Sequence, residues 1–146
     1  MIRVGTDLIE IARVHRSLER YARFRDRCFT PEEQAYCDSR PNPAESYAGR
    51  FAGKEAVGKA LGSGVHFTWR EIEIRGRPKP GVHLTGRTAA LARGMGAGSI
   101  ELSMTHSREL AAAVAVVTAS CAASRPCSRR RRRAGRWTPM PDRSRS

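Results

Sequence analysis

The pattern of hydrophobic and polar positions changes its period several times along the chain, and each period predicts a different kind of element. Residues 8–14 place apolar side chains at helical spacing, and this stripe continues to about Tyr21. Residues 70–75 and 99–105 alternate polar with apolar side chains, which is typical of a strand with one face in water. Residues 110–117 are continuously apolar and rich in Ala and Val, which fits a buried strand or a helix; we interpret them as a strand.

Turn and capping residues mark the boundaries between these segments. Thr30 and Pro31 are typical of a helix start, and the sequence RPNP at residues 40–43 ends that helix. Asn42 then caps a longer helix, and Gly62 stops it. The other predicted elements are a strand at 1–6, a short helix at 30–39, the long helix at 43–61, a strand at 82–85 that forms a hairpin with 70–75, and a small helix at 88–93. This order predicts an α+β domain with a mostly antiparallel sheet packed around one long central helix.

The long central helix carries an acid and a base on one face. Glu55 and Lys59 are four residues apart, and Phe51 continues their line one turn earlier. The positions within about 60° of this line on the helix surface are occupied by small residues: Ala48, Ala52, Gly58 and Gly62. The lack of bulk leaves room for a ligand, a metal ion or another chain. The alternative is an exposed ion pair that contributes about 0.2–0.5 kcal/mol.

Four polar residues at the ends of predicted elements are candidates for chemistry: Asp7, Glu55, Lys59 and His106. Two carboxylates can hold Mg²⁺, and a nearby lysine attracts phosphate as a point charge. His106 can take or give a proton near neutral pH. Each has a simpler alternative, since Asp7 can cap a helix and His106 can be a surface or capping residue. The sequence has no Ser-His-Asp order, phosphate-binding glycine loop or HExxH motif, so the residues alone allow a magnesium–phosphate enzyme.

Charge is distributed unevenly along the chain. The formal net charge is +13, and residues 122–146 supply +8 of it through nine Arg and one Asp. Residues 1–121 keep 18 basic against 13 acidic residues. We predict a folded domain at 1–121, whose moderate positive charge suits an anionic ligand or an acidic partner. Residues 122–146 cannot bury enough apolar surface to fold, so we predict a disordered Arg-rich tail there.

The cysteines and the apolar runs indicate a cytoplasmic protein. The four cysteines, at positions 28, 37, 121 and 127, have no CxxC spacing, which argues against a zinc site. They do not resemble a disulfide framework either, so we interpret them as reduced thiols in the cytoplasm. The N-terminus shows no signal-peptide core, and the longest apolar run, residues 110–117, is too short to span a bilayer.

Three separated blocks of the sequence occur in the order and at the intervals of a known enzyme family. They are VGTDLIEIAR at residues 4–13, RFAGKEAVGKALG at 50–62, and LSMTHS at 102–107 with the Ala-rich run that follows; GRP at 76–78 is a shorter fourth. With these blocks the chain resembles holo-acyl carrier protein synthase, the short bacterial 4′-phosphopantetheinyl transferase, from residue 1 to about 118. The central block departs from the family pattern at Gly53, where Ala or Ser is more common, and at Gly58. Each glycine is expected to loosen the helix by roughly 0.5–1 kcal/mol relative to Ala.

The resemblance implies a specific reaction. Members of this family transfer the phosphopantetheine arm of coenzyme A to a serine of an acyl carrier protein and release adenosine 3′,5′-bisphosphate. Asp7 and Glu55 stand at the positions that bind magnesium in the family, where the ion bridges the pyrophosphate and stabilises charge on the departing group. The base that takes the serine proton stays open between His106, a metal-bound water and an active-site carboxylate.

The resemblance also implies contacts to coenzyme A and an assembly. Arg50, Lys59 and Gly62 are expected to contact coenzyme A, with Lys59 facing its phosphates because it lies one turn beyond Glu55. Family members are homotrimers with sites between subunits. The small residues around Glu55 agree with close approach by a neighbouring subunit.

A crowd of arginines lies in and after the first predicted helix, at positions 13, 16, 20, 23, 25 and 27. They can simply be a solvated face. The resemblance implies instead that Arg13, Arg23 and Arg27 dock the acidic carrier protein, which serves fatty-acid or polyketide synthesis. A competing class is a nucleic-acid-binding protein that uses the arginine run at 129–133. The folded part has no recognition motif, so we expect nucleic acid to bind only nonspecifically, through the tail.

Overall fold

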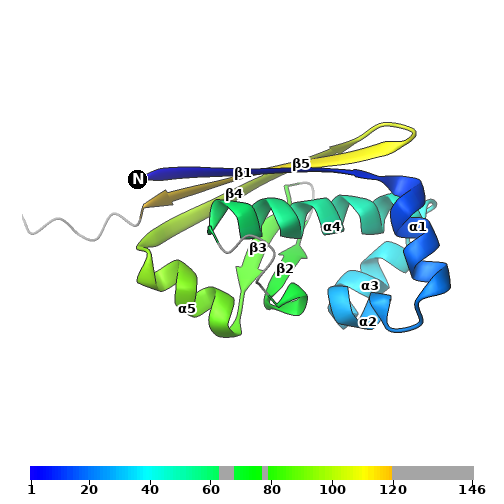
Figure 1. Ribbon diagram of the computed structural model, residues 1–146, viewed down its shortest axis with the longest axis horizontal. Coiled ribbons are helices and arrows are strands. Elements are labelled where there is room, and N and C mark those ends of the chain that lie inside the picture. The colour runs from blue at the N-terminus through cyan, green and yellow to red at the C-terminus, as the bar shows by residue number, and fades with distance from the viewer. Residues whose placement is uncertain (63–67, 77–78, 120–146) are drawn as a thin grey trace, which may run out of the picture.

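The computed structural model describes residues 1–62, 68–76 and 79–119 of the chain (Figure 1). The predicted tail at 122–146 lies outside the described residues, together with Cys121, Cys127 and most of the GRP block at 76–78. The boundary predicted at residue 121 and the disorder predicted beyond it therefore stay predictions.

The described residues form six helical segments and five strands. In chain order these are β1 (Ile2–Glu10), α1 (Ile11–Arg20), α2 (Phe24–Cys28), α3 (Pro31–Asp38), α4 (Pro43–Ala60), the 3₁₀ turn η1 (Trp69–Glu71), β2 (Ile72–Arg75), β3 (Gly81–Leu84), α5 (Gly86–Gly94), β4 (Ala97–His106) and β5 (Leu110–Ala119). The α+β class is confirmed, as is the strand at the apolar run that begins β5.

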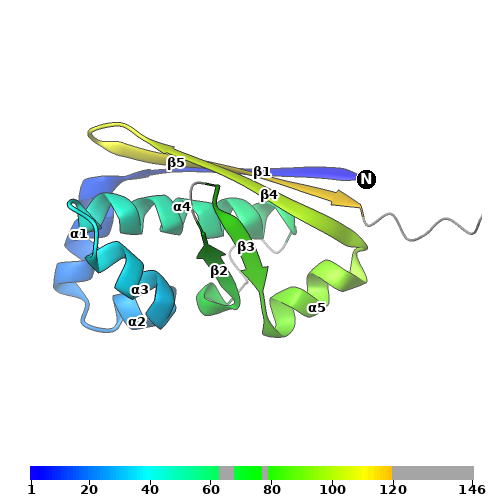
Figure 2. The same cartoon turned by 180° about the vertical axis from the view of Figure 1, so that it is seen from behind.

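The strands form two antiparallel sheets, and α4 lies between them. The larger sheet has the order β1-β5-β4, while β2 and β3 form a separate hairpin, as predicted. Figure 1 shows α4 lying along one face of the larger sheet. Helices α1 to α3 lie below one end of α4, and the hairpin and α5 lie below its middle and other end; Figure 2 shows the same layers from behind. The long helix is therefore central, as predicted.

Local capping chemistry places the helix starts where the sequence predicts them. Thr30 and Glu33 form a reciprocal capping box at the start of α3. The Asn42 side chain accepts a hydrogen bond from the Glu45 N–H at the start of α4. Both caps satisfy amide groups that have no partner inside the helix. The short helix α2, which follows α1 closely, is not among the predicted elements.

Strand β1 is longer than predicted, and this changes the setting of Asp7. The strand continues to Glu10 because it pairs with β5 along its whole length, with Asp7 opposite Ala113. Asp7 is thus an internal strand residue and not a helix cap; α1 begins after Glu10, whose side chain makes no capping hydrogen bond. The prediction of a strand ending at residue 6 was wrong because the spacing of apolar residues there fits both elements, and the ladder with β5 decides between them.

Small residues allow α4 to lie against the larger sheet. Ala48, Ala52 and Gly58 are buried, and a Cβ atom on Gly5 of β1 would lie only 2.0 Å from the carbonyl oxygen of Ala56. The prediction that the small residues of this helix leave room beside Glu55 for a ligand or another chain was therefore wrong for these positions. The chain's own core encloses them, since close backbone approach leaves no space for larger side chains.

The face of the larger sheet that points away from α4 carries exposed apolar side chains. Ile2, Val4, Leu8 and Val114 are between 42% and 74% exposed. Strand side chains alternate between faces, so these residues share the outer face while Gly5 and Ile9 point toward α4. We call this surface the outer sheet face. Among the described residues, no helix is both long and apolar enough to cross a membrane.

Candidate functional site

Three of the predicted site residues meet between β1 and the second half of α4. The Lys59 ammonium donates hydrogen bonds to the Asp7 carboxylate (Nζ–Oδ1 2.8 Å) and to the Thr6 carbonyl (3.0 Å). It also forms an ion pair with Glu55 one turn earlier, with Nζ–Oε2 at 3.8 Å. We call Asp7, Glu55 and Lys59 the acid cluster. The structure confirms that these three residues lie together, although Asp7 precedes Glu55 by 48 positions in the sequence.

The strand geometry explains why Asp7 reaches α4. Gly5, Asp7 and Ile9 share the inward face of β1 because strand residues alternate. Gly5 lets this strand pass close to the backbone of Ala56 and Ala60, which brings the short Asp7 side chain within reach of Lys59. The position of the acid cluster therefore depends on a glycine two residues before the acid.

The acid cluster has one more acid than base. Burial raises the pKa of Glu55, the negative charge of Asp7 raises it further, and the Lys59 charge opposes both effects. The hydrogen bond to Asp7 raises the pKa of Lys59. An added cation would be attracted here, because two carboxylates face a single ammonium group.

The donor set fits magnesium better than zinc. In the described part of the chain, no group of three or more His, Cys, Asp or Glu side chains is arranged around one metal position. Asp7 and Glu55 offer two carboxylates, and Mg²⁺ typically takes one or two carboxylates and fills its other positions with water and phosphate oxygens. The site therefore suits a metal that arrives with, or is completed by, a phosphate ligand.

An aromatic wall lies beside the acid cluster. A hollow of about 170 Å³ is lined by Asp7, Glu55, Arg13, Phe24 and Phe51, among others. The Phe51 ring stacks on Phe24 with centroids 5.9 Å apart. A substrate that reaches the acid cluster from this side meets both an arginine and an apolar surface.

His106 lies elsewhere. It is the last residue of β4, and its Nε2 is 2.8 Å from Glu45 Oε1 at the start of α4. Glu45 precedes Glu55 by ten residues, which span about 15 Å of helix. Within one chain the structure therefore does not bring His106 to the acid cluster, and its partner Glu45 was not predicted.

Arg50 lies beside His106 and not beside Lys59. Arg50 and His106 line a hollow of about 420 Å³, and the Arg50 guanidinium carbon lies 3.8 Å from the centre of the Tyr36 ring. Arg50 is only 6% exposed, and its Nε finds no hydrogen-bond partner among the described residues. Arg40 lines the same hollow. We call this hollow the His106 pocket; it presents the positive charges of the buried Arg50 and the half-buried Arg40 to an incoming anion.

The predicted coenzyme A contacts are therefore divided between two places. Gly62 lies two residues beyond the end of α4 with φ of +75°, and its N–H donates to the Lys59 carbonyl. The Arg3 guanidinium occupies the space where a side chain at position 62 would begin. Gly62 and Lys59 thus lie at one end of α4, while Arg50 lies in the His106 pocket. Sequence reasoning missed Tyr36 and Arg40, since their link to His106 is made only by folding.

The predicted docking arginines are exposed. Arg13 lies on α1, and Arg23 and Arg27 lie next to or within α2. Arg13 also lines the hollow of the acid cluster, so the basic surface and the acids adjoin. Arg25 differs from these three, because it forms an ion pair with Asp38. The structure thus separates a structural arginine from those that remain accessible.

The described cysteines are buried free thiols and not nucleophiles. Burial raises the pKa of Cys28 to about 11 and that of Cys37 to about 12. Both therefore stay protonated at neutral pH, when a thiol is a poor nucleophile and metal ligand.

Comparison with known proteins gives a consistent result. The family model of the 4′-phosphopantetheinyl transferase superfamily matches residues 3–115. Holo-[acyl-carrier-protein] synthase of Moorella thermoacetica is 48% identical over 125 residues, which cover 82% of this chain and 96% of that protein. The crystal structure of holo-[acyl-carrier-protein] synthase from Neisseria meningitidis aligns with a TM-score of 0.74 at 29% identity, over 81% of this chain and 99% of that one. The Helicobacter pylori synthase in complex with coenzyme A aligns with a TM-score of 0.69 at 30% identity, over 79% of this chain and 99% of that one.

Proposed function

The chain belongs to the 4′-phosphopantetheinyl transferase superfamily, and we propose that it transfers the 4′-phosphopantetheine group of coenzyme A to a serine of apo-acyl carrier protein. The observation that carries the proposal is the convergence of Asp7, Glu55 and Lys59 from β1 and α4. The Helicobacter pylori relative was solved with coenzyme A, which supports this donor. The second product is adenosine 3′,5′-bisphosphate, since a phosphorus–oxygen bond within the pyrophosphate linkage of coenzyme A must break.

Asp7 and Glu55 would hold a magnesium ion. Their carboxylates lie close enough for the charge of Asp7 to raise the pKa of Glu55, and a cation between them relieves that repulsion. When bound, Mg²⁺ supplies stabilisation of negative charge on the pyrophosphate oxygens.

Lys59 would bind the phosphates of the donor. Its side chain is 42% exposed, so its ammonium can turn toward a phosphate while it remains beside Asp7. The serine oxygen of the carrier attacks the phosphorus attached to pantetheine, the bond to the leaving phosphate breaks, and the serine proton passes to a base. We assign the role of that base to His106 of a second copy. His106 of the same chain pairs with Glu45, and about 15 Å of helix separates Glu45 from Glu55 of the acid cluster.

A homotrimer would bring the two half-sites together. Each chain carries an acid cluster and, separately, a His106 pocket with the buried Arg50. The outer sheet face offers apolar area for association, since contiguous exposed apolar residues are typical of protein interfaces. In such an assembly the acids of one copy and the positive pocket of the next would share one molecule of coenzyme A.

The carrier protein would dock on the arginines beside the acid cluster. Arg13, Arg23 and Arg27 are exposed, and Arg13 lines the hollow that holds Glu55. Carrier proteins are acidic, so opposite charge would orient the serine toward the cluster. We place the reaction in the cytoplasm, in agreement with the free thiols of Cys28 and Cys37.

One incubation tests the function. Purified protein, coenzyme A, magnesium and an apo-carrier protein are combined, and the intact mass of the carrier is measured. A gain of one phosphopantetheine is expected, with none when the acceptor serine is replaced by alanine. No gain with the unmodified carrier rejects the proposed function.

Mixing two inactive variants tests the shared site. Asp7→Asn and His106→Ala each remove one half-site, so each alone is expected to transfer slowly. If the two halves come from different copies, unfolding and refolding the variants together restores part of the activity, and the mass in solution is near three chains. An active monomer, or no restoration on mixing, contradicts the shared site.

A further inference from the structure

The interior contains a buried ion pair that the reaction does not use. The Lys54 side chain is 0% exposed and that of Glu33 is 1% exposed, and their Nζ and Oε2 atoms are 2.6 Å apart. Burial lowers the pKa of Lys54, and the Glu33 charge opposes this effect. A charge that is this deeply buried is costly unless its hydrogen bonds are satisfied, so its contacts indicate what it holds together.

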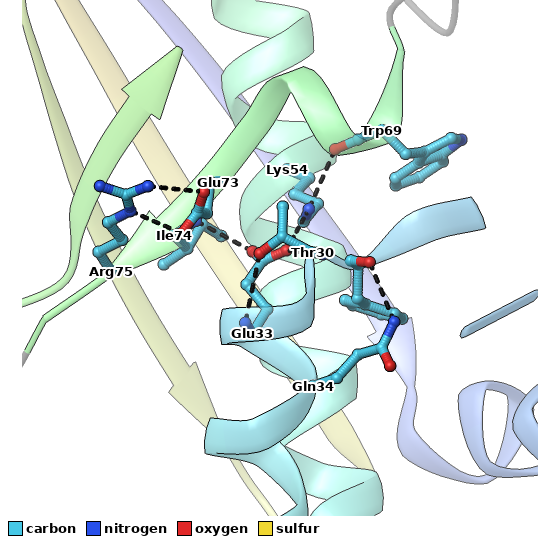
Figure 3. A network of polar contacts seen from close by, with 9 residues as sticks. Thr30, Glu33, Gln34, Lys54, Trp69, Glu73, Ile74 and Arg75 are labelled. Atoms are coloured by element: carbon cyan, nitrogen blue, oxygen red, sulfur yellow. Dashed lines mark hydrogen bonds and ion pairs between the residues drawn. The ribbon is translucent and has the colours of Figure 1, made fainter. Parts of the chain in front are cut away.

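The pair joins elements that are distant in the sequence, as Figure 3 shows. The Lys54 ammonium donates a hydrogen bond to the backbone carbonyl of Trp69 (3.0 Å) in η1. The Glu33 carboxylate accepts hydrogen bonds from the N–H groups of Thr30 and Ile74, both at 3.0 Å. Lys54 thus ties η1 to the central helix directly, and through Glu33 it also ties α3 and β2 to it.

Trp69 connects this network to the acid cluster. Its ring stacks on Phe51 with centroids 4.3 Å apart and planes at 25°. Phe51 in turn stacks on Phe24, and these two rings line the hollow that holds Asp7 and Glu55. The Trp69 ring therefore supports the back of the aromatic wall, while the Lys54 ammonium holds the Trp69 backbone.

We propose that Lys54 is a positioning residue, which fixes Trp69 and through it the aromatic wall against which the acceptor protein places its serine. This inference rests on the proposed function. Lys54 touches none of the reacting groups, so its loss should change the use of the acceptor and leave binding of coenzyme A unchanged. A purely structural ion pair would lower stability without this selectivity.

The test uses a variant that removes both charges, and its fold is checked by circular dichroism before the kinetics are compared. Lys54→Met alone would leave the Glu33 carboxylate buried without a partner, whereas Glu33→Gln with Lys54→Met removes the pair, a change that proteins often tolerate. The ion pair of Glu73 and Arg75 in β2 provides a control that removes two charges nearby, since these two side chains are hydrogen-bonded to each other (Figure 3). The control variant is Glu73→Gln with Arg75→Met.

Two readouts are compared in a Trp137→Phe background, which leaves Trp69 as the sole tryptophan of the chain. For Glu33→Gln/Lys54→Met we expect stronger acrylamide quenching of Trp69 fluorescence and a loss of about tenfold in kcat/KM for the carrier, because a small misplacement of bound groups has effects of this size or larger. The KM for coenzyme A should stay unchanged, and the control variant should match the parent in both readouts.

Unchanged quenching overturns the proposal, as do unchanged carrier kinetics in a variant whose quenching has risen. Equal losses for the carrier and for coenzyme A also overturn it, since they indicate general distortion. If the parent chain modifies no carrier protein, the proposed function fails separately, and the quenching comparison alone decides whether Lys54 holds Trp69.

Discussion

Two lysines on α4, five residues apart, form ion pairs with acids in opposite surroundings. Lys54 is fully buried, and its ammonium is held by one carboxylate and one carbonyl. Lys59 is 42% exposed and faces the carboxylates of Asp7 and Glu55. Burial lowers the pKa of Lys54, whereas the hydrogen bond to Asp7 raises that of Lys59.

The difference separates a charge that holds the fold from a charge that can meet a ligand. The pair of Lys54 and Glu33 balances one positive with one negative charge, and its acceptors are already occupied by backbone groups of α3 and β2. The acid cluster has one excess carboxylate and partial access to solvent, so it can still bind a cation or a phosphate. The two lysines lie on the same helix and pair with similar partners. They have different roles because their burial and the charge balance around them differ.

The largest expected effect is on stability and tests this contrast directly. Lys54→Met should lower the free energy of unfolding by about 3–5 kcal/mol, since it leaves a buried carboxylate without its counter-charge. Lys59→Met should change it by less, about 1 kcal/mol, because the Lys59 side chain is 42% exposed and water screens its charge. Urea unfolding of both variants measures the difference. Similar losses in the free energy of unfolding for the two variants would show that burial does not distinguish the roles of the two lysines.

The next effect concerns transfer and not stability. Asp7→Asn and Glu55→Gln keep the side-chain size but remove a charged oxygen, so each should lower kcat by about 10²–10³-fold, a typical loss for one electrostatic contact to the reacting group. The magnesium concentration that gives half of the maximal rate should rise in both variants. Steady-state rates across a magnesium titration measure this, and Glu101→Gln on the exposed face of β4 is the control. Near-normal rates at low magnesium in both variants would remove the metal assignment.

A third effect concerns the basic surface next to the acid cluster. Arg13→Glu with Arg23→Glu should raise the KM for the carrier by about tenfold or more at low salt and leave coenzyme A binding nearly unchanged, because the reversed charges repel an acidic partner. Arg87→Glu with Arg93→Glu on α5 makes the same change of net charge elsewhere. Kinetics at two salt concentrations compare the pairs. An equal rise for both would mean that net charge, and not its position, attracts the carrier.

The smallest effect is a pH dependence of stability in magnesium-free buffer. The pKa of Glu55 is raised above its ordinary value of 4.5, so the folded state binds more protons than the unfolded state. Stability is therefore lost as pH rises from about 4.5 through the folded-state pKa. Glu55→Gln should escape this loss and gain stability relative to the parent as pH rises above about 4.5. A constant difference as pH rises would show that neither burial nor the charge of Asp7 raises the pKa of Glu55 in the folded state.

Local features of the sequence determined the boundaries of several elements. Thr30 and Asn42 cap α3 and α4 because a capping side chain acts on amide groups two or three residues away. The spacing of Glu55 and Lys59 places them on one helix face by helix geometry alone. The family blocks further indicated that Asp7 joins them, and the structure confirms this proximity.

Tertiary structure decided the rest, since it depends on contacts between elements that are distant in the chain. Pairing with β5 made Asp7 a strand residue, although its neighbours also fit a helix. Folding placed His106 against Glu45, which is 61 positions away, and buried Lys54 against Glu33, which is 21 positions away. It also enclosed Ala48 and Ala52, which the helical pattern leaves open. A local pattern records which residues share a face, but only packing determines whether that face meets solvent, a sheet or a counter-charge.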